Sequence, residues 1–152
     1  MAAEQDDRPE PHTLAEKLDR LFRTVHPAGR GEYSSEHVAA VLREQGGPTI
    51  SATYLWQLRN GVRDNPTKRH LEALAGFFGV DPGYFFDAEA SARITAELEL
   101  LAAMRDQDVR SVALRAADLS PQSLAAVRCM IEHTRRLEGL PAEPGVPAAA
   151  GL

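Results

Sequence analysis

Hydrophobic residues recur every three or four positions along most of the chain, the interval at which side chains share one face of an α-helix. The first such stripe follows Thr13-Leu14-Ala15-Glu16, a pattern typical of a capping box that opens a helix, and it ends before Pro27. Four further stripes follow: Val38, Val41 and Leu42; Leu71, Leu74, Ala75 and Phe78; Ile94, Leu98, Leu101 and Met104; and Leu124, Val127, Met130, Ile131 and Leu137. The pattern predicts an all-α fold.

Glycines and small hydroxyl residues mark the ends of these predicted helices. Glycine can adopt the left-handed conformation that ends a helix, and it follows the predicted helices at Gly46-Gly47-Pro48, Gly61, Gly79 and Gly139. A hydroxyl can accept a hydrogen bond from a free N–H of the first turn, and the candidates are Ser34 or Ser35, Ser51, Thr67 and Ser120. Residues 88–117 lack glycine and proline, so we expect a long helix there, with a break near residues 106–108.

A change in composition after Asp87 predicts two domains. Residues 12–86 should form a compact unit of four to five helices, and residues 88–139 a second helical domain, in which residues 88–117 are rich in Ala, Leu, Glu and Arg. Residues 1–11 are predicted to be a disordered acidic tail, and residues 140–152 a second disordered tail rich in proline and alanine. Two or three helices cannot bury the apolar residues on both of their sides by themselves. We therefore expect residues 88–139 to pair with a second copy. The alternative is a monomeric bundle that packs back on residues 12–86.

The segment 51–60 is predicted to be a short helix with an unusual outer face. Leu55 and Leu58 share its inner face. The outer face combines an indole with polar groups that add no stability there: Thr53, Trp56, Gln57 and Asn60. The preceding predicted helix ends about five residues earlier, a spacing typical of a helix-turn-helix. We therefore expect residues 51–60 to be a recognition helix in a DNA major groove.

Side chains near the N-terminus of such a helix reach the base edges. Glutamine can form two hydrogen bonds with adenine, and the methyl groups of Thr and Ala, or an indole, can contact the methyl group of thymine. The candidate base contacts are Ser51, Ala52, Thr53, Trp56 and Gln57. The candidate contacts to the DNA backbone, which set register, are Arg30, Ser35, Asn60, Arg63, Asn65 and Lys68. Arg30 is included because it lies in a Gly-Arg-Gly loop, which is otherwise a simple linker.

The net charge of −5 conceals an uneven distribution. Residues 1–11 and 87–152 each carry a net charge of −3, whereas residues 12–86 carry +1. Within that range, residues 49–70 hold four basic residues against one acid, a net charge of +3. Affinity for phosphate depends on the charge of the docking face rather than on the sum, so the negative net charge does not exclude DNA as a partner. A solvated charge cluster is the alternative interpretation.

Patterns that carry catalysis or metal binding are missing from the sequence. The single cysteine, Cys129, excludes an intramolecular disulfide and a cysteine-based zinc site, and we expect it to be a small core residue. The five histidines lie far apart in sequence, and the serines show no nucleophile-elbow pattern. No apolar run approaches the length of a membrane span. We predict a cytoplasmic protein that is not an enzyme, has no cofactor or metal, and does not contact a membrane.

The segment Ser51–Gly61, followed by Asn65-Pro66, Leu74-Ala75 and Asp81-Pro82-Gly83-Tyr84-Phe85, resembles the phage-repressor-like (Cro/CI, XRE-type) helix-turn-helix family. Further motifs are similar to EspR-like actinobacterial nucleoid-associated regulators: Arg20-Leu21-Phe22, Pro27-Ala28-Gly29-Arg30-Gly31, Gln57-Leu58-Arg59 and Met104-Arg105-Asp106. The similarity covers roughly residues 13–139.

The resemblance implies a lambda-repressor-like helix-turn-helix domain followed by a helical C-terminal dimerisation domain. It implies a transcriptional regulator that binds double-stranded DNA as a homodimer, associates with the nucleoid, and bridges or loops distant sites. By this reading the dimer contacts come from Ile94, Leu98, Leu101, Met104, Val112, Leu124, Val127 and Ile131. Trp56 stands where small or polar residues are usual, so the preferred DNA sequence does not follow from the resemblance.

Two other functions compete with this interpretation. In the first, the helix-turn-helix is a protein-interaction module, and Trp56 is a hot spot for a regulatory protein or RNA polymerase. In the second, the C-terminal helices sense a small ligand, although no stretch there combines an apolar pocket with convergent polar groups. Dependence on salt would separate DNA binding from a contact centred on Trp56.

Overall fold

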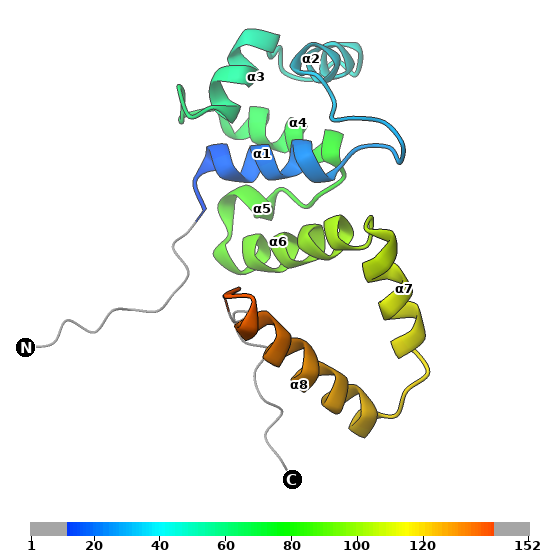
Figure 1. The fold of residues 1–152 in the computed structure, drawn as a ribbon. Helices are drawn as coiled ribbons and strands as arrows, with labels where there is room; N and C mark the ends of the chain where they lie inside the picture. The colour runs from blue at the N-terminus through cyan, green and yellow to red at the C-terminus, as the bar shows by residue number, and fades with distance from the viewer. Residues whose placement is uncertain (1–11, 142–152) are drawn as a thin grey trace, which may run out of the picture. The chain divides into compact units, whose positions relative to one another are not determined.

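A computed structural model describes residues 12–141, and both predicted tails except residues 140 and 141 lie outside the described residues. The described residues form eight helices and no strand, which confirms the all-α prediction. They divide into a first compact unit that ends at Met104 and a second that begins at Arg105. The helices are α1 (Leu14–Thr24), α2 (Ser35–Glu44), α3 (Ala52–Arg59), α4 (Lys68–Phe78), α5 (Gly83–Phe86), α6 (Ala88–Ala103), α7 (Gln107–Ala116) and α8 (Pro121–Leu137) (Figure 1).

The helix starts follow the local chemistry of the sequence. The side chain of Thr13 accepts from the backbone N–H of Glu16, whose carboxylate accepts from the backbone N–H of Thr13 in turn, so the predicted capping box is confirmed. This last bond is the main reason why the pKa of Glu16 lies below its ordinary value. Predicted N-caps are confirmed for α2, α3, α4 and α8 at Ser34, Ser51, Thr67 and Ser120.

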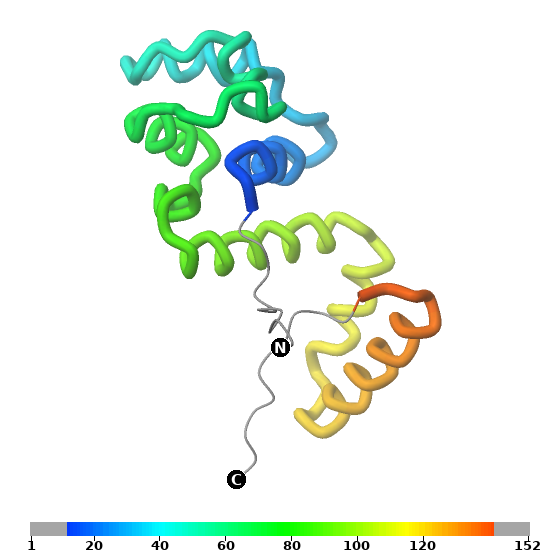
Figure 2. Tube along the Cα trace, turned by 90° about the vertical axis from the view of Figure 1, so that its left-hand side faces the viewer, coloured from blue at the N-terminus to red at the C-terminus, as the bar shows by residue number. Residues whose placement is uncertain are grey.

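Helix α1 is the centre of the first unit. Leu18, Leu21 and Phe22 are completely buried on its inner face. It packs against α3 on one side and against α6 on the other, as the two views show (Figures 1 and 2). The ring of Phe22 meets the edge of Phe78 from α4, with 5.1 Å between centroids. A single hydrophobic core therefore links the helices on both sides of α1.

The short helix α5 anchors the end of this core. Tyr84 is completely buried, and its hydroxyl donates to the backbone carbonyl of Lys17 in α1 over 3.2 Å. Burial raises the pKa of Tyr84 above its ordinary value. The N-terminal turn is closed by Asp81, whose Oδ1 accepts from the backbone N–H of Gly83 at 2.7 Å. Helix α5 thereby leads directly into α6.

Helix α6 packs within the first unit, whereas we drew the domain boundary before it, after Asp87. It lies against α5 and α1 and buries Ile94 and Leu98, each 5% exposed. Arg20 of α1 adds an ion pair across this contact, 2.7 Å from Glu99. The composition of α6 is that of a long exposed helix, but its apolar stripe completes the core around α1.

The second unit, α7 and α8, has almost no interior. None of its described residues is buried, and Leu114, Met130 and Leu137 are 67%, 69% and 75% exposed. Cys129, which we expected in a core, is exposed. The predicted break between α6 and α7 is confirmed, since Asp106 caps α7 with its side chain. No helix in the described range is long and apolar enough to cross a bilayer.

Candidate nucleic-acid interface

Helix α3 is held by its inner face and leaves its outer face accessible. Leu55 and Leu58 are completely buried, and the helix packs against both α1 and α2. Its N-terminus is fixed by Ser51, whose hydroxyl accepts from the backbone N–H of Tyr54 at 3.1 Å. Beyond its end, Gly61 adopts a positive φ of 73°, which turns the chain sharply towards α4. The helix is therefore anchored at its start and along its inner face.

The five candidate base contacts lie at the start and along the outer side of α3. Ser51 and Thr53 are exposed, and Trp56 exposes 54% of its surface. Ala52 and Gln57 are half-buried, so their side chains are partly accessible. The hydroxyl of Ser51 already accepts a hydrogen bond but remains able to donate one. Together these residues combine hydrogen-bonding and apolar groups on one helix.

The candidate backbone contacts after α3 are arranged less uniformly. The side-chain amide of Asn60 donates to the backbone carbonyl of Trp56 at 2.9 Å, so one of its donor hydrogens serves the end of the helix. The guanidinium of Arg63 is exposed and lies 5.9 Å from the centroid of the Tyr54 ring. Asn65 is exposed, and Lys68 is exposed 3.7 Å from Glu72. Arg63 is thus the best presented cation of this group.

The remaining two candidates lie before α3. Ser35 is the first residue of α2 and is half-buried. Arg30 is exposed in the loop between α1 and α2, which turns at Gly29 with a φ of 75°. The backbone N–H of Arg30 donates to the carbonyl of Pro27 over 3.2 Å, which closes this turn. Arg30 therefore projects from a formed turn.

Arg59 has a structural role that charge counting did not reveal. Its guanidinium lies 2.9 Å from Asp19 and 2.7 Å from Glu32, and its central carbon lies 4.6 Å from the centroid of the Phe22 ring. Burial alone would lower the pKa of Arg59, but the bonds to Glu32 and Asp19 raise it above its ordinary value. The net charge of residues 49–70 therefore overstates the charge available to DNA. The sequence indicated that Arg59 lies on the inner face of α3, because it follows the buried Leu55 by four residues and shares its face.

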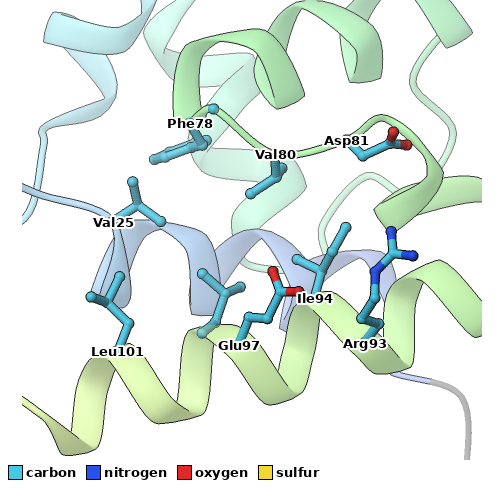
Figure 3. Close-up of a pocket in the computed structure, with 10 residues that line it drawn as sticks. Val25, Phe78, Val80, Asp81, Arg93, Ile94, Glu97 and Leu101 are labelled. Atoms are coloured by element: carbon cyan, nitrogen blue, oxygen red, sulfur yellow. The ribbon is translucent and has the colours of Figure 1, made fainter.

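The candidate dimer contacts fall into two groups. Ile94 and Leu98 are buried against the rest of the first unit, whereas we predicted that they contact a second copy. They line a groove of about 530 Å³ between α6, the end of α1 and the segment after α4. Figure 3 shows Val25 and Leu101 at one end of this groove and Asp81 and Arg93 at the other. The others are half-buried or exposed: Leu101, Met104, Val112, Leu124, Val127 and Ile131.

No group of three or more histidine, cysteine, aspartate or glutamate side chains converges on a common point within residues 12–141. The candidate site in the described part of the chain instead consists of the side chains of α3 and of the residues that hold α3 in place. These side chains provide hydrogen-bonding, apolar and positively charged groups.

Comparison with known proteins places the chain in a family. It is 44% identical over 130 residues to the nucleoid-associated protein EspR of Mycobacterium tuberculosis, in strains H37Rv and CDC 1551. The match covers 86% of this chain and 98% of the relative. The chain belongs to the EspR family. No family model matches the sequence.

The similarity to EspR is not limited to the region around α3. The first unit ends at Met104, so an alignment of 130 residues must include parts of both units. The EspR-like resemblance drawn from the sequence motifs is thereby confirmed.

Proposed function

We propose that this chain is a nucleoid-associated transcriptional regulator that binds DNA as a homodimer. The observation that carries the proposal is the outer face of α3, where Trp56 is 54% exposed beside Thr53 and Gln57 on a helix anchored by two completely buried leucines. Membership of the EspR family supports it, because the relatives are nucleoid-associated proteins.

In this proposal α2 and α3 form a helix-turn-helix, and α3 enters the major groove. Thr53, Trp56 and Gln57 then face base edges, with Ser51 and Ala52 at the leading end of the helix. Arg63 is placed to bind phosphate, since it is exposed just after α3 and is steered by the Tyr54 ring. Arg59 is excluded from this role because two carboxylates hold it.

The homodimer is proposed from the state of the second unit. Two helices that bury none of their described residues and expose Leu114, Met130 and Leu137 leave a large apolar surface in water. A second copy would cover this surface with the same surface of its own, as in most two-fold symmetric dimers. Such a dimer carries two DNA-binding units, and we propose that it bridges or loops separate DNA sites.

Genome-wide mapping of bound DNA in the native host tests the proposal. We expect enrichment at many discrete sites that share a sequence motif, and loss of that motif preference when Gln57 and Thr53 are both changed to alanine. Enrichment no greater than that of a protein without DNA affinity would refute the proposal.

The exposure of Trp56 favours one second candidate, a contact with a regulatory protein or RNA polymerase. An exposed tryptophan surrounded by polar residues is typical of an interaction hot spot. Trp56→Ala separates the two functions. If Trp56 faces a protein, the variant keeps wild-type affinity for DNA and loses the protein. If Trp56 faces DNA, the variant loses affinity or specificity for DNA.

A further inference from the structure

The loop between α1 and α2, residues 25–34, is tied to the last turn of α3 by an ion pair. Glu32 Oε2 in this loop lies 2.7 Å from Nη2 of Arg59. The two residues are 27 positions apart in sequence, and they join the loop that carries Arg30 to the helix that carries the candidate base contacts.

The side chain of Arg59, to which the loop is attached, is held in place by several other contacts. Its Nε donates to Asp19 Oδ1 of α1 at 2.9 Å, and its guanidinium lies over the face of Phe22 at 4.6 Å. Asp19 is itself held by Arg23 at 2.7 Å. The side chain of Arg59 is only 21% exposed. A guanidinium bonded on two edges and stacked on a ring has little freedom to move.

Arg30 lies two residues before Glu32, so its Cα is within about 7 Å of the Cα of Glu32 whatever the loop conformation. Within the described part of the chain no ion pair or hydrogen bond holds its exposed side chain. Arg30 is thus a free cation in the loop that Glu32 attaches to α3.

We propose that Glu32, through Arg59, is a positioning residue that holds the loop so that Arg30 binds a phosphate beside the groove that α3 enters. This inference rests on the proposed DNA-binding function. A helix in the major groove has a phosphate backbone on either side, and in this proposal Arg30 reaches one of them. Glu32 therefore supports DNA binding although its own charge repels DNA.

The charge of Glu32 and its positioning role predict opposite effects on DNA affinity, so the proposal can be tested. The affinity is measured by fluorescence anisotropy, with full-length protein, a duplex from a bound site and a salt titration. If Glu32 acts only through its charge, Glu32→Ala binds DNA more tightly. If Glu32 positions Arg30, Glu32→Ala weakens binding by about 3–10-fold, and the slope of log Kobs against log[salt] becomes shallower by about 0.9, the loss of one phosphate contact.

A double-mutant cycle completes the test. Arg30→Ala should reproduce the loss seen in Glu32→Ala, and the double variant should lose no more than Arg30→Ala alone. The matched control is Glu36→Ala, which removes an exposed acid in the first turn of α2 and should leave affinity equal or slightly higher. Thermal unfolding of each variant separates loss of the fold from loss of the contact.

Two results overturn the inference while leaving the proposed function intact. One is tighter or unchanged binding by Glu32→Ala, as for Glu36→Ala. The other is a double variant whose loss is the product of the two single losses, which shows that Arg30 and Glu32 act independently. Failure of the wild-type protein to bind any duplex at low salt overturns both proposals together.

Discussion

Gln57 is the side chain on α3 best suited to read a base by hydrogen bonding. Its backbone carbonyl accepts from the N–H groups of Val62 and Arg63, at 2.9 and 3.2 Å, so the backbone at this position is fixed while the amide remains partly accessible. Gln57→Ala should cost about 1–3 kcal/mol of binding free energy at a specific site, and discrimination at one base pair should relax. Anisotropy with the site and its single-base variants measures both. Equal losses on every duplex would show that Gln57 reads no base.

Arg63 should act on all sequences alike, because phosphates carry no sequence information. Arg63→Ala is expected to weaken specific and non-specific binding by the same factor and to flatten the salt slope by about 0.9. Arg115→Ala is the matched control, since it removes an exposed arginine from α7. The control should leave the affinity unchanged. A sequence-dependent loss in Arg63→Ala would contradict a phosphate contact.

Arg59 should matter for stability where Arg63 does not. Arg59→Met keeps the apolar stem but leaves Asp19 and Glu32 without their cation, so the free energy of unfolding should fall by about 1–3 kcal/mol. Arg69→Met, an exposed arginine of α4, should change it by less than about 0.5 kcal/mol. Urea denaturation compares the two. Equal stabilities would show that the ion pairs contribute nothing.

For single residues, the sequence predicts whether a side chain lies on the buried or the exposed face of a helix better than it predicts which residues that side chain contacts. Helical periodicity places Leu55 inside and Thr53 and Trp56 outside, and the structure agrees. The carboxylates that hold Arg59 lie 40 and 27 residues away in sequence. No local pattern relates residues at such distances, so Arg59 was counted with the DNA-facing charges.

The ends of the helices could be predicted because their causes are local. A hydroxyl cap bonds an N–H three residues on, as Thr67 does with His70 over 3.3 Å. A glycine with positive φ ends a helix by its own conformational freedom, as Gly79 does after α4 with a φ of 70°. Both signals lie within a few residues of the helix end, so no tertiary contact was needed to find it.

The sequence could not predict which unit α6 packs in, because this depends on tertiary contacts. Its stripe of Ile94, Leu98 and Leu101 has the same spacing whether it faces α1 or a second copy. Packing decides the matter, since Ile94 and Leu98 are both 5% exposed within the first unit.

Substitutions on α6 test this assignment. Ile94→Ala should lower the free energy of unfolding by about 2–4 kcal/mol through lost burial and a residual cavity, without changing the oligomeric state. Leu100→Ala, on the same helix but 64% exposed, should have little effect on stability. Urea denaturation and sedimentation velocity measure the two properties. Conversion of Ile94→Ala to a stably folded monomer would instead place Ile94 in the dimer interface.

For the whole molecule, the exposed apolar surface of α7 and α8 predicts self-association. Ile131 exposes 46% of its surface on α8. Ile131→Lys should convert the dimer to a monomer at micromolar concentration, because a lysine cannot be buried in an apolar interface without large cost. Gln122→Lys, which adds the same charge at an exposed position of α8, should remain dimeric. Analytical ultracentrifugation distinguishes them, and a monomeric wild-type protein would refute the dimer.

The central claim is that a chain with a net charge of −5 binds DNA through a locally basic surface around α3. The most direct test is the affinity of the purified wild-type protein for a DNA duplex as a function of salt. Contacts with at least four phosphates predict a slope of log Kobs against log[salt] of roughly −3.6 or steeper. An affinity that does not change with salt, or no binding at low salt, would contradict the account.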